Sequence, residues 1–285
     1  MVKAADRAKR PARTSVWLEG KAAARGGGGG RRSDQPSGLD RDRITETTVR
    51  LLDAEGLAKF SMRRLAAELN VTAMSVYWYV DTKDDLLELA LDAVFGELNL
   101  PEADANADAG QDPDPYPDSE TKADTKADTK ADWRDQLREL AAEYRKLLVR
   151  HAWVSPLVGT FLNIGPNSMR FSLTVQRAVK NTGLPPHEQM GALSAVFQFV
   201  YGFGTIEGHF VQRCASAGMT QDEYFQQAMG TVKAEPRFAE MVESSTELMD
   251  ARGGDTVEEM RERDFRIALD LMVAGIEAML ARTRS

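Results

Sequence analysis

The amino-acid sequence is poor in cysteine, in histidine and in long apolar runs, and each shortage excludes a class of protein. Its single cysteine, Cys214, excludes an intrachain disulfide and a cysteine zinc cluster. The longest uncharged runs, residues 153–169 and 189–206, contain polar side chains and glycines, so they are typical of buried helices rather than of membrane spans. The N-terminus is basic but lacks the apolar core of a secretory signal. We therefore expect a cytoplasmic protein that has no membrane partner.

Sequence motifs of catalytic sites are also lacking. The three histidines form no HExxH motif, and the chain has neither a P-loop nor a GxSxG sequence. Glu207 and His209 lie two residues apart on a predicted helix and therefore project about 200° from one another. The sequence predicts no catalytic residue, no metal site and no cofactor.

Charge and composition divide the chain into four parts. Residues 1–39 are basic, poor in apolar side chains and interrupted by five consecutive glycines, which predicts a disordered basic arm. Residues 101–132 are acidic and end in three Thr-Lys-Ala-Asp repeats. On a helix these repeats would stack like charges, so they predict a disordered linker. Residues 40–100 and 133–285 remain as two folded domains.

Both folded parts show only helical patterns. In residues 40–100, four capping residues each precede an apolar helical pattern: Asp40, Ser61, Thr72 and Thr82. Beyond residue 133, apolar side chains recur at helical spacing in four stretches: 137–148, 171–179, 187–217 and 265–280. The sequence predicts an all-α fold, in which a three-helix domain is joined by a connecting helix to a larger helical domain.

Residues 61–79 have the size of a helix-turn-helix motif, in which two short helices are joined by a turn. Asn70 stands in the turn and tolerates the positive φ that such a turn needs. The second helix, expected over residues 73–80, would enter the major groove of DNA. A three-helix packing module that binds no DNA explains the periodicity equally well, so the pattern leaves both alternatives open.

Short segments carry a resemblance to a known family. Three segments resemble the DNA-binding domain of the tetracycline-repressor (TetR) family: FSMRRLAAELNV at 60–71, SVYWYV at 75–80 and KDDLL at 83–87. A weaker similarity to the ligand-binding half of that family rests on LVGT at 157–160 and GPN at 165–167. The resemblance implies a homodimer in which an effector bound to the C-terminal helices tilts the connecting helix and releases operator DNA.

The resemblance also implies which residues contact DNA. Arg63 would touch a base edge or a phosphate, and Lys83 would grip the DNA backbone. The other positions lie around the second helix of the motif: Thr72 as its cap, Ala73, Met74 and Ser75 facing bases, Tyr77 and Tyr79 reaching phosphates, and Trp78 against a sugar or a thymine methyl group. Trp78 also suits a helix core, and Arg64 is expected to be a solvated surface charge.

The basic arm is a second candidate for contact with DNA. Residues 44–100 are net acidic, whereas affinity for DNA depends largely on cations. Arg25, Arg31 and Arg32 precede the first helix, and the glycines among them allow close approach to an adjacent minor groove. A solvated tail that only aids solubility is the alternative.

The effector site is predicted from residue type. Sites between helices are typically apolar with a few polar groups, and aromatic residues are concentrated in two C-terminal stretches. The candidates are Trp153, Phe161, Phe197, Gln198, Tyr201, Glu207 and His209, with His151 as a further polar group. Tetracycline repressors place a histidine just beyond the connecting helix, where this chain has Leu98-Asn99-Leu100. A magnesium-tetracycline effector is therefore not indicated.

These observations predict a transcriptional regulator, most simply a repressor released from double-stranded operator DNA by a bulky apolar small molecule such as an antibiotic or a related metabolite. The apolar stripe at 265–280 and the long apolar helix before it predict a homodimer, with Met272 and Ile276 in its interface. A helical protein-interaction adaptor without sequence-specific DNA binding is the alternative. Binding to DNA at physiological salt would distinguish the two.

Overall fold

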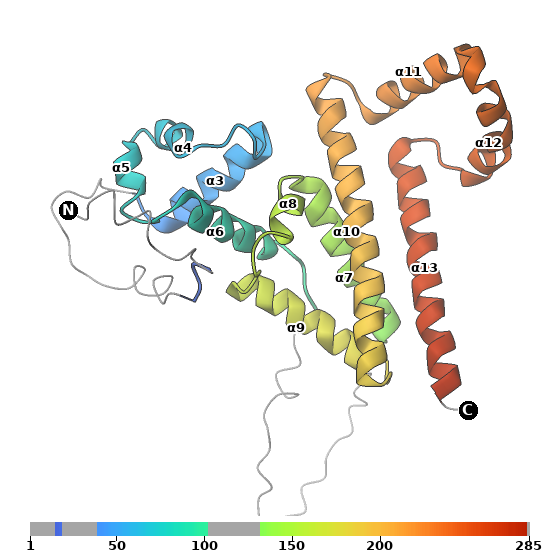
Figure 1. The fold of residues 1–285 in the computed structure, drawn as a ribbon, viewed down its shortest axis with the longest axis horizontal. Helices are drawn as coiled ribbons and strands as arrows, with labels where there is room; N and C mark the ends of the chain where they lie inside the picture. Colours follow the sequence, from blue (N-terminus) through green and yellow to red (C-terminus); the bar gives the residue numbers. More distant parts are fainter. Residues whose placement is uncertain (1–14, 19–38, 102–131, 284–285) are drawn as a thin grey trace, which may run out of the picture.

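The computed structural model describes residues 15–18, 39–101 and 132–283, and this described part is built of helices without a strand (Figure 1). Most of the predicted arm and linker lies outside the described residues, so their disorder stays a prediction. Four arm residues, 15–18, are placed against the N-terminal domain, and Ser15 and Val16 among them are buried. We call these four residues the anchor segment. Residues 1–39 were expected to be disordered throughout, whereas these four residues pack against the domain.

The N-terminal domain consists of four helices: α3 (Arg41–Glu55), α4 (Met62–Glu68), α5 (Ala73–Val76) and α6 (Lys83–Phe95). The predicted caps are confirmed, because Asp40, Ser61 and Thr72 each accept a hydrogen bond from the backbone N–H three residues further on. Thr82 forms a capping box with Asp85 at the start of α6. Caps and first turns adjoin in sequence, which explains why these starts were predictable.

The turn of the motif has the expected geometry, but the helix after it is shorter than predicted. Asn70 has a φ of 54°, in the left-handed region. The second helix, expected over residues 73–80, ends at Val76, because the N–H groups of Trp78 and Tyr79 bond to carbonyls three residues back. Residues 77–79 therefore form a turn that continues the direction of α5.

Arg64 differs from the expected solvated charge. Its guanidinium donates to Glu55 of α3 at 2.8 Å and to Glu68 of α4 at 2.9 Å. Arg50 of α3 also pairs with Glu68 at 3.1 Å. The Arg64–Glu55 and Arg50–Glu68 pairs join the first helix of the helix-turn-helix motif to α3.

The C-terminal domain contains seven α-helices and one short 3₁₀ helix among the described residues: α7 (Trp133–Arg150), α8 (Val154–Val158), α9 (Pro166–Lys180), α10 (Pro186–Ser216), α11 (Gln221–Ala234), η1 (Pro236–Phe238), α12 (Ala239–Arg252) and α13 (Val257–Thr283). Figure 1 shows α7 and α13 beside the long α10, and α9 below α6. The crossing of α7 and α10 is close, because a Cβ added at Gly208 would lie 2.7 Å from the Leu148 carbonyl oxygen. Within the described chain, none of the helices is long and apolar enough to cross a membrane.

Candidate nucleic-acid interface

The helix-turn-helix presents large side chains to solvent. Met74 of α5 is 68% exposed and Trp78, in the turn after it, is 56% exposed. Tyr77 and Arg63 of α4 are also exposed. Exposed apolar and aromatic residues on one short element are typical of an interaction surface, and this surface fits the groove-reading part of such a motif.

The residues expected to face bases are not all equally available. Ala73 packs against the domain core. The Ser75 hydroxyl lies 2.9 Å from that of Thr72, which also accepts from the Ser75 N–H and so caps α5. Met74 is therefore the residue of the trio 73–75 that projects furthest from the domain.

Tyr79 and Lys83, both expected at phosphates, have partners inside the protein. The Tyr79 hydroxyl donates to the Leu39 carbonyl at 2.6 Å, and burial, helped by Asp40, raises the pKa of Tyr79 above its usual value. Lys83 donates from Nζ to the Phe60 carbonyl at 3.0 Å. A phosphate contact by Tyr79 competes with the bond that holds the start of α3. Lys83 stands at the first turn of α6 and needs only to exchange one carbonyl oxygen for a phosphate oxygen.

Arg25, Arg31 and Arg32 lie outside the described residues, so their predicted entry into a minor groove stays a prediction. The acidic character of the domain, in contrast, has a structural explanation. Asp85, Glu88 and Asp92 of α6 are buried and their carboxylates accept hydrogen bonds from protein groups. These three carboxylates thus bind groups of the protein itself and do not face solvent.

Asp92 connects α6 to the C-terminal domain. Its carboxylate accepts from the backbone N–H of Ser168 at 2.9 Å and from the side-chain amide of Asn167 at 3.2 Å, both in the first turn of α9. The preceding Gly165 is required, because a Cβ there would lie 2.2 Å from Asp92 Oδ1. The GPN segment at 165–167 is recognisable in the sequence, whereas its partner Asp92 is not. The sequence does contain one indication of such a partner, because α9 begins after a glycine, which offers no side chain to cap the helix.

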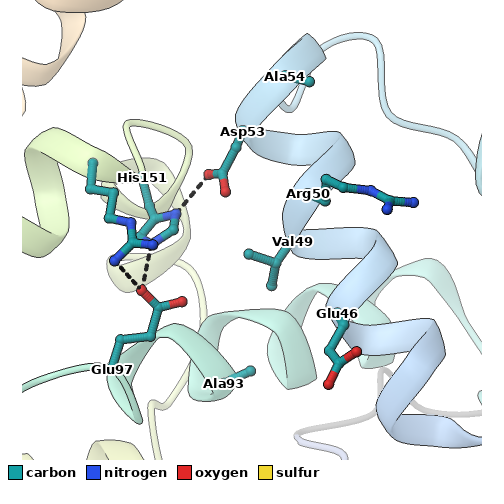
Figure 2. A pocket seen from close by; sticks show the side chains of 9 residues that line it. Glu46, Val49, Arg50, Asp53, Ala54, Ala93, Glu97 and His151 are labelled. Carbon is teal, nitrogen blue, oxygen red and sulfur yellow. Dashed lines mark hydrogen bonds and ion pairs between the residues drawn. The ribbon is translucent and has the colours of Figure 1, made fainter.

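His151 forms a second connection, shown in Figure 2. It follows α7, is 2% exposed in its side chain, and bonds through Nδ1 to Asp53 of α3 at 2.6 Å and through Nε2 to Glu97 at 3.1 Å. Burial alone would lower the pKa of His151, but hydrogen bonds and charge from Asp53 and then Glu97 outweigh it and raise the pKa. An imidazole that faces carboxylates at both nitrogens can donate to both only when protonated. His151 therefore links the two domains, with both bonds donated when the ring is protonated, and its place among the effector candidates stays a prediction.

Arg150 and Trp153 complete this connection. Arg150 pairs with Glu97 at 3.0 Å, and the Trp153 indole donates to Asp53 at 2.7 Å. Trp153 was expected to line an effector cavity, but its position after α7 directs it to α3 instead. Trp153 thus makes a contact between the domains, and its predicted effector role stays a prediction.

Two family models match the chain. The model for bacterial regulatory proteins of the tetR family matches residues 44–90, and the model for the tetracyclin repressor-like C-terminal domain matches residues 126–280. The second match alone covers more than half of the chain. This chain belongs to the TetR family. The predicted helix-turn-helix domain and larger helical domain are confirmed with it.

Similar proteins are transcriptional regulators. An HTH-type transcriptional regulator of Saccharopolyspora erythraea is 35% identical over 164 residues, which are 58% of this chain and 59% of that protein. The HTH-type transcriptional repressor DrrR1 of Streptomyces coeruleorubidus is 28% identical over 272 residues, which are 94% of this chain and 86% of that protein. This chain thus spans less than two thirds of the first relative. Both relatives are named for the regulation of transcription.

Solved structures show the same fold. Apo ActR of Streptomyces coelicolor matches with a TM-score of 0.61 at 23% identity, over 87% of this chain and 99% of that one. ActR in complex with actinorhodin matches with a TM-score of 0.59 at 24% identity, over 85% and 97%. At these identities the likeness concerns the architecture of the TetR-family chain and not its ligand.

Aromatic rings from four helices meet where α6 reaches the C-terminal domain of this TetR-family protein. Phe171 of α9 lies 5.7 Å from Phe95 of α6 and 5.3 Å from Tyr144 of α7, between ring centroids. Phe197 of α10 lies 5.9 Å from Phe171. Of the predicted effector residues, Phe197 belongs to this cluster and Phe161 packs against the same core. The Tyr201 hydroxyl donates to the Ser155 carbonyl at 2.9 Å.

The three polar effector candidates separate into buried and exposed positions. Glu207 is buried and accepts from Arg145 at 2.7 Å and 3.0 Å, an arginine that the sequence analysis missed. Gln198 and His209 are exposed on α10. They lie on the side of the helix that carries the exposed Ile206, and not on the side that packs against α7. Both residues are exposed in the single chain, and their place in an effector site stays a prediction. Among the described residues, no group of three acidic, histidine or cysteine side chains gathers to hold a metal ion.

Proposed function

We propose that this TetR-family regulator is a repressor that leaves its operator when a bulky, largely apolar small molecule binds in the C-terminal domain. The aromatic cluster of Phe95, Tyr144, Phe171 and Phe197 is the observation that supports this proposal. One of its rings belongs to α6, whose first turn carries Lys83 of the DNA-binding surface. A flat apolar molecule among these rings would displace Phe95 and therefore move α6.

Similarity to named proteins agrees with this role. DrrR1 is named a transcriptional repressor, and ActR has been crystallised with actinorhodin. Actinorhodin is therefore a reasonable first probe for this chain, although the two proteins share only 24% identity.

We further propose a homodimer built from α10 and α13. Each helix has large exposed apolar side chains: Met190 and Ile206 on α10, and Ile267 and Leu271, one turn apart, on α13. A Cβ added at Gly202 or Gly275 would meet nothing within 4 Å, so these glycines leave the outer faces flat. Two flat apolar helices from each subunit can pack around a twofold axis, which spaces two recognition surfaces for one operator.

Selection of DNA from a random pool by the full-length protein tests the proposed function. We expect enrichment of a palindromic sequence that is bound at physiological salt. Adding actinorhodin should weaken that binding at least about tenfold if the effector class is right, since a differential affinity of about 1.4 kcal/mol suffices for that factor. A protein that enriches no sequence would be the helical adaptor instead. If a DNA sequence is enriched but actinorhodin does not weaken binding, actinorhodin is not an effector, and the proposal of a DNA-binding regulator stands without it.

A further inference from the structure

The anchor segment, residues 15–18, is bound to α6 by a carboxylate far away in sequence. Glu88 accepts from the Ser15 hydroxyl at 2.5 Å through Oε1 and from the Val16 backbone N–H at 2.8 Å through Oε2. The Trp17 backbone N–H donates to the Ser15 hydroxyl oxygen at 3.2 Å. The two carboxylate oxygens thus each receive one donor from the anchor segment.

Burial shows that the contact is specific. Glu88 is 4% exposed, and Ser15 and Val16 are also buried. Val16 belongs to the apolar core of the helices, and Trp17 packs at its edge. A carboxylate buried this deeply needs donors, because an unsatisfied buried charge is strongly unfavourable. The anchor segment supplies them.

The end of the arm is held as well. Leu39 is buried, and its carbonyl accepts the 2.6 Å hydrogen bond from Tyr79 beside the recognition helix. The chain between the anchor segment and Leu39 therefore begins and ends on the DNA-binding domain. Lys and Arg outnumber Asp and Glu on both sides of the anchor segment: Lys3, Arg7, Lys9, Arg10 and Arg13 against Asp6 before it, and Lys21, Arg25, Arg31 and Arg32 against Glu19 and Asp34 after it.

We propose that Glu88 is the receptor for an intramolecular anchor, residues 15–18, and that this anchor strengthens operator binding by holding the cationic N-terminal stretches at the DNA-binding domain. Fixing a charged stretch near its target raises its effective concentration there, and each phosphate it neutralises releases counterions. This inference rests on the proposed function, since it needs DNA as the partner. In this proposal Glu88 acts by holding the anchor segment and not by touching DNA.

Glu88→Ala tests the anchor through two measurements, amide hydrogen exchange at Val16 and fluorescence anisotropy on the selected duplex across a salt series. We expect at least about tenfold faster exchange at Val16. Binding to DNA should weaken about three- to tenfold with a shallower salt slope. In a chain that lacks residues 1–18, the same substitution should leave DNA binding unchanged. Glu139→Ala, at an exposed glutamate of α7, is the matched control and should change neither measurement.

Ser15→Ala removes one of the two donors without altering α6, and we expect a smaller change in the same direction for both measurements. Unchanged exchange at Val16 in Glu88→Ala would refute the anchor. Equal loss of DNA affinity with and without residues 1–18 would show that Glu88 acts through α6 alone, which also refutes the proposal. If the wild type selects no DNA sequence, the proposed function fails together with the effect on DNA, whereas exchange at Val16 still decides whether the anchor exists.

Discussion

Asp92 of α6 and Ser168 of α9 are joined by a 2.9 Å hydrogen bond that connects the N-terminal domain to the C-terminal domain. The carboxylate occupies the N-terminus of α9, where backbone N–H groups lack helical partners and the helix dipole favours negative charge. α9 also carries Phe171 of the aromatic cluster. A shift of α9, such as the proposed effector would cause, would therefore reach α6 at two points, Phe95 and Asp92.

Gly165→Ala should weaken this connection. The added methyl group would lie 2.2 Å from Asp92 Oδ1, so either the carboxylate or the start of α9 must move. Loss of the buried hydrogen bonds should lower the free energy of unfolding by about 1–3 kcal/mol. Gly159→Ala is the control, because a Cβ there meets nothing within 4 Å. Thermal denaturation of the two variants should separate them by several degrees, and equal melting temperatures would contradict the assigned role of Gly165.

His151 gives a prediction of pH dependence. Its pKa is raised in the folded protein, so its contribution to stability is fully present below the usual value near 6.5. The contribution is lost as the pH rises through the higher folded value, because the neutral ring can donate to only one of Asp53 and Glu97. The melting temperature of the wild type should therefore be higher than that of His151→Gln. This difference should be largest at about pH 6 and should shrink in alkaline buffer.

The exposed His209 provides the control for that experiment. His209→Gln should follow the wild-type melting temperature at every pH. A gap between wild type and His151→Gln that stays constant from acid to alkaline pH would mean that packing, and not the imidazolium charge, is what His151 contributes.

Comparison of sequence and structure shows what local pattern can predict. Asp40, Ser61 and Thr82 were predictable as caps because each acts on a residue three positions away. Asp92 and Ser168 lie 76 residues apart, and the short pattern around either one does not identify its partner. Such contacts between domains follow from tertiary packing.

The C-terminal helices show two further limits of periodicity. α11 and α12 bury no residue in the single chain, so they carry no strong apolar stripe and the sequence analysis did not identify them. In α13 the stripe was recognised, yet periodicity does not say which apolar face meets a partner. Ile276, expected in the dimer interface, is 4% exposed within its own chain, whereas Leu271 is 69% exposed.

Leu271→Glu should therefore disrupt the dimer and leave the subunit folded. The substitution places a charge on the outer face of α13, where burial against a second chain would be strongly unfavourable. Light scattering should show monomers that retain the helical circular dichroism of the wild type. Leu248→Glu, at a similarly exposed leucine of α12, should remain dimeric. Dimers in both variants would exclude this face of α13 from the interface.

Lys83 and Met74 should affect DNA binding in different ways. Lys83 stands at the first turn of α6 with its Nζ on the Phe60 carbonyl, so it is placed for a phosphate and not for a base edge. Lys83→Ala should weaken binding to all duplexes alike and reduce the salt slope by about one unit. Met74→Ala should instead change the order of preference among duplexes, because its side chain is exposed on the helix that is expected to enter the groove.

Anisotropy on the selected duplex and on single-base variants of it measures both effects. Lys180→Ala, an exposed lysine at the end of α9, is the control for charge and should bind every duplex as the wild type does. If Lys180→Ala lowers the salt slope as much as Lys83→Ala, the loss follows from net charge and Lys83 makes no particular phosphate contact. If Lys83→Ala reorders the preference among duplexes, the lysine reads a base, and the position of its Nζ at Phe60 changes when DNA binds.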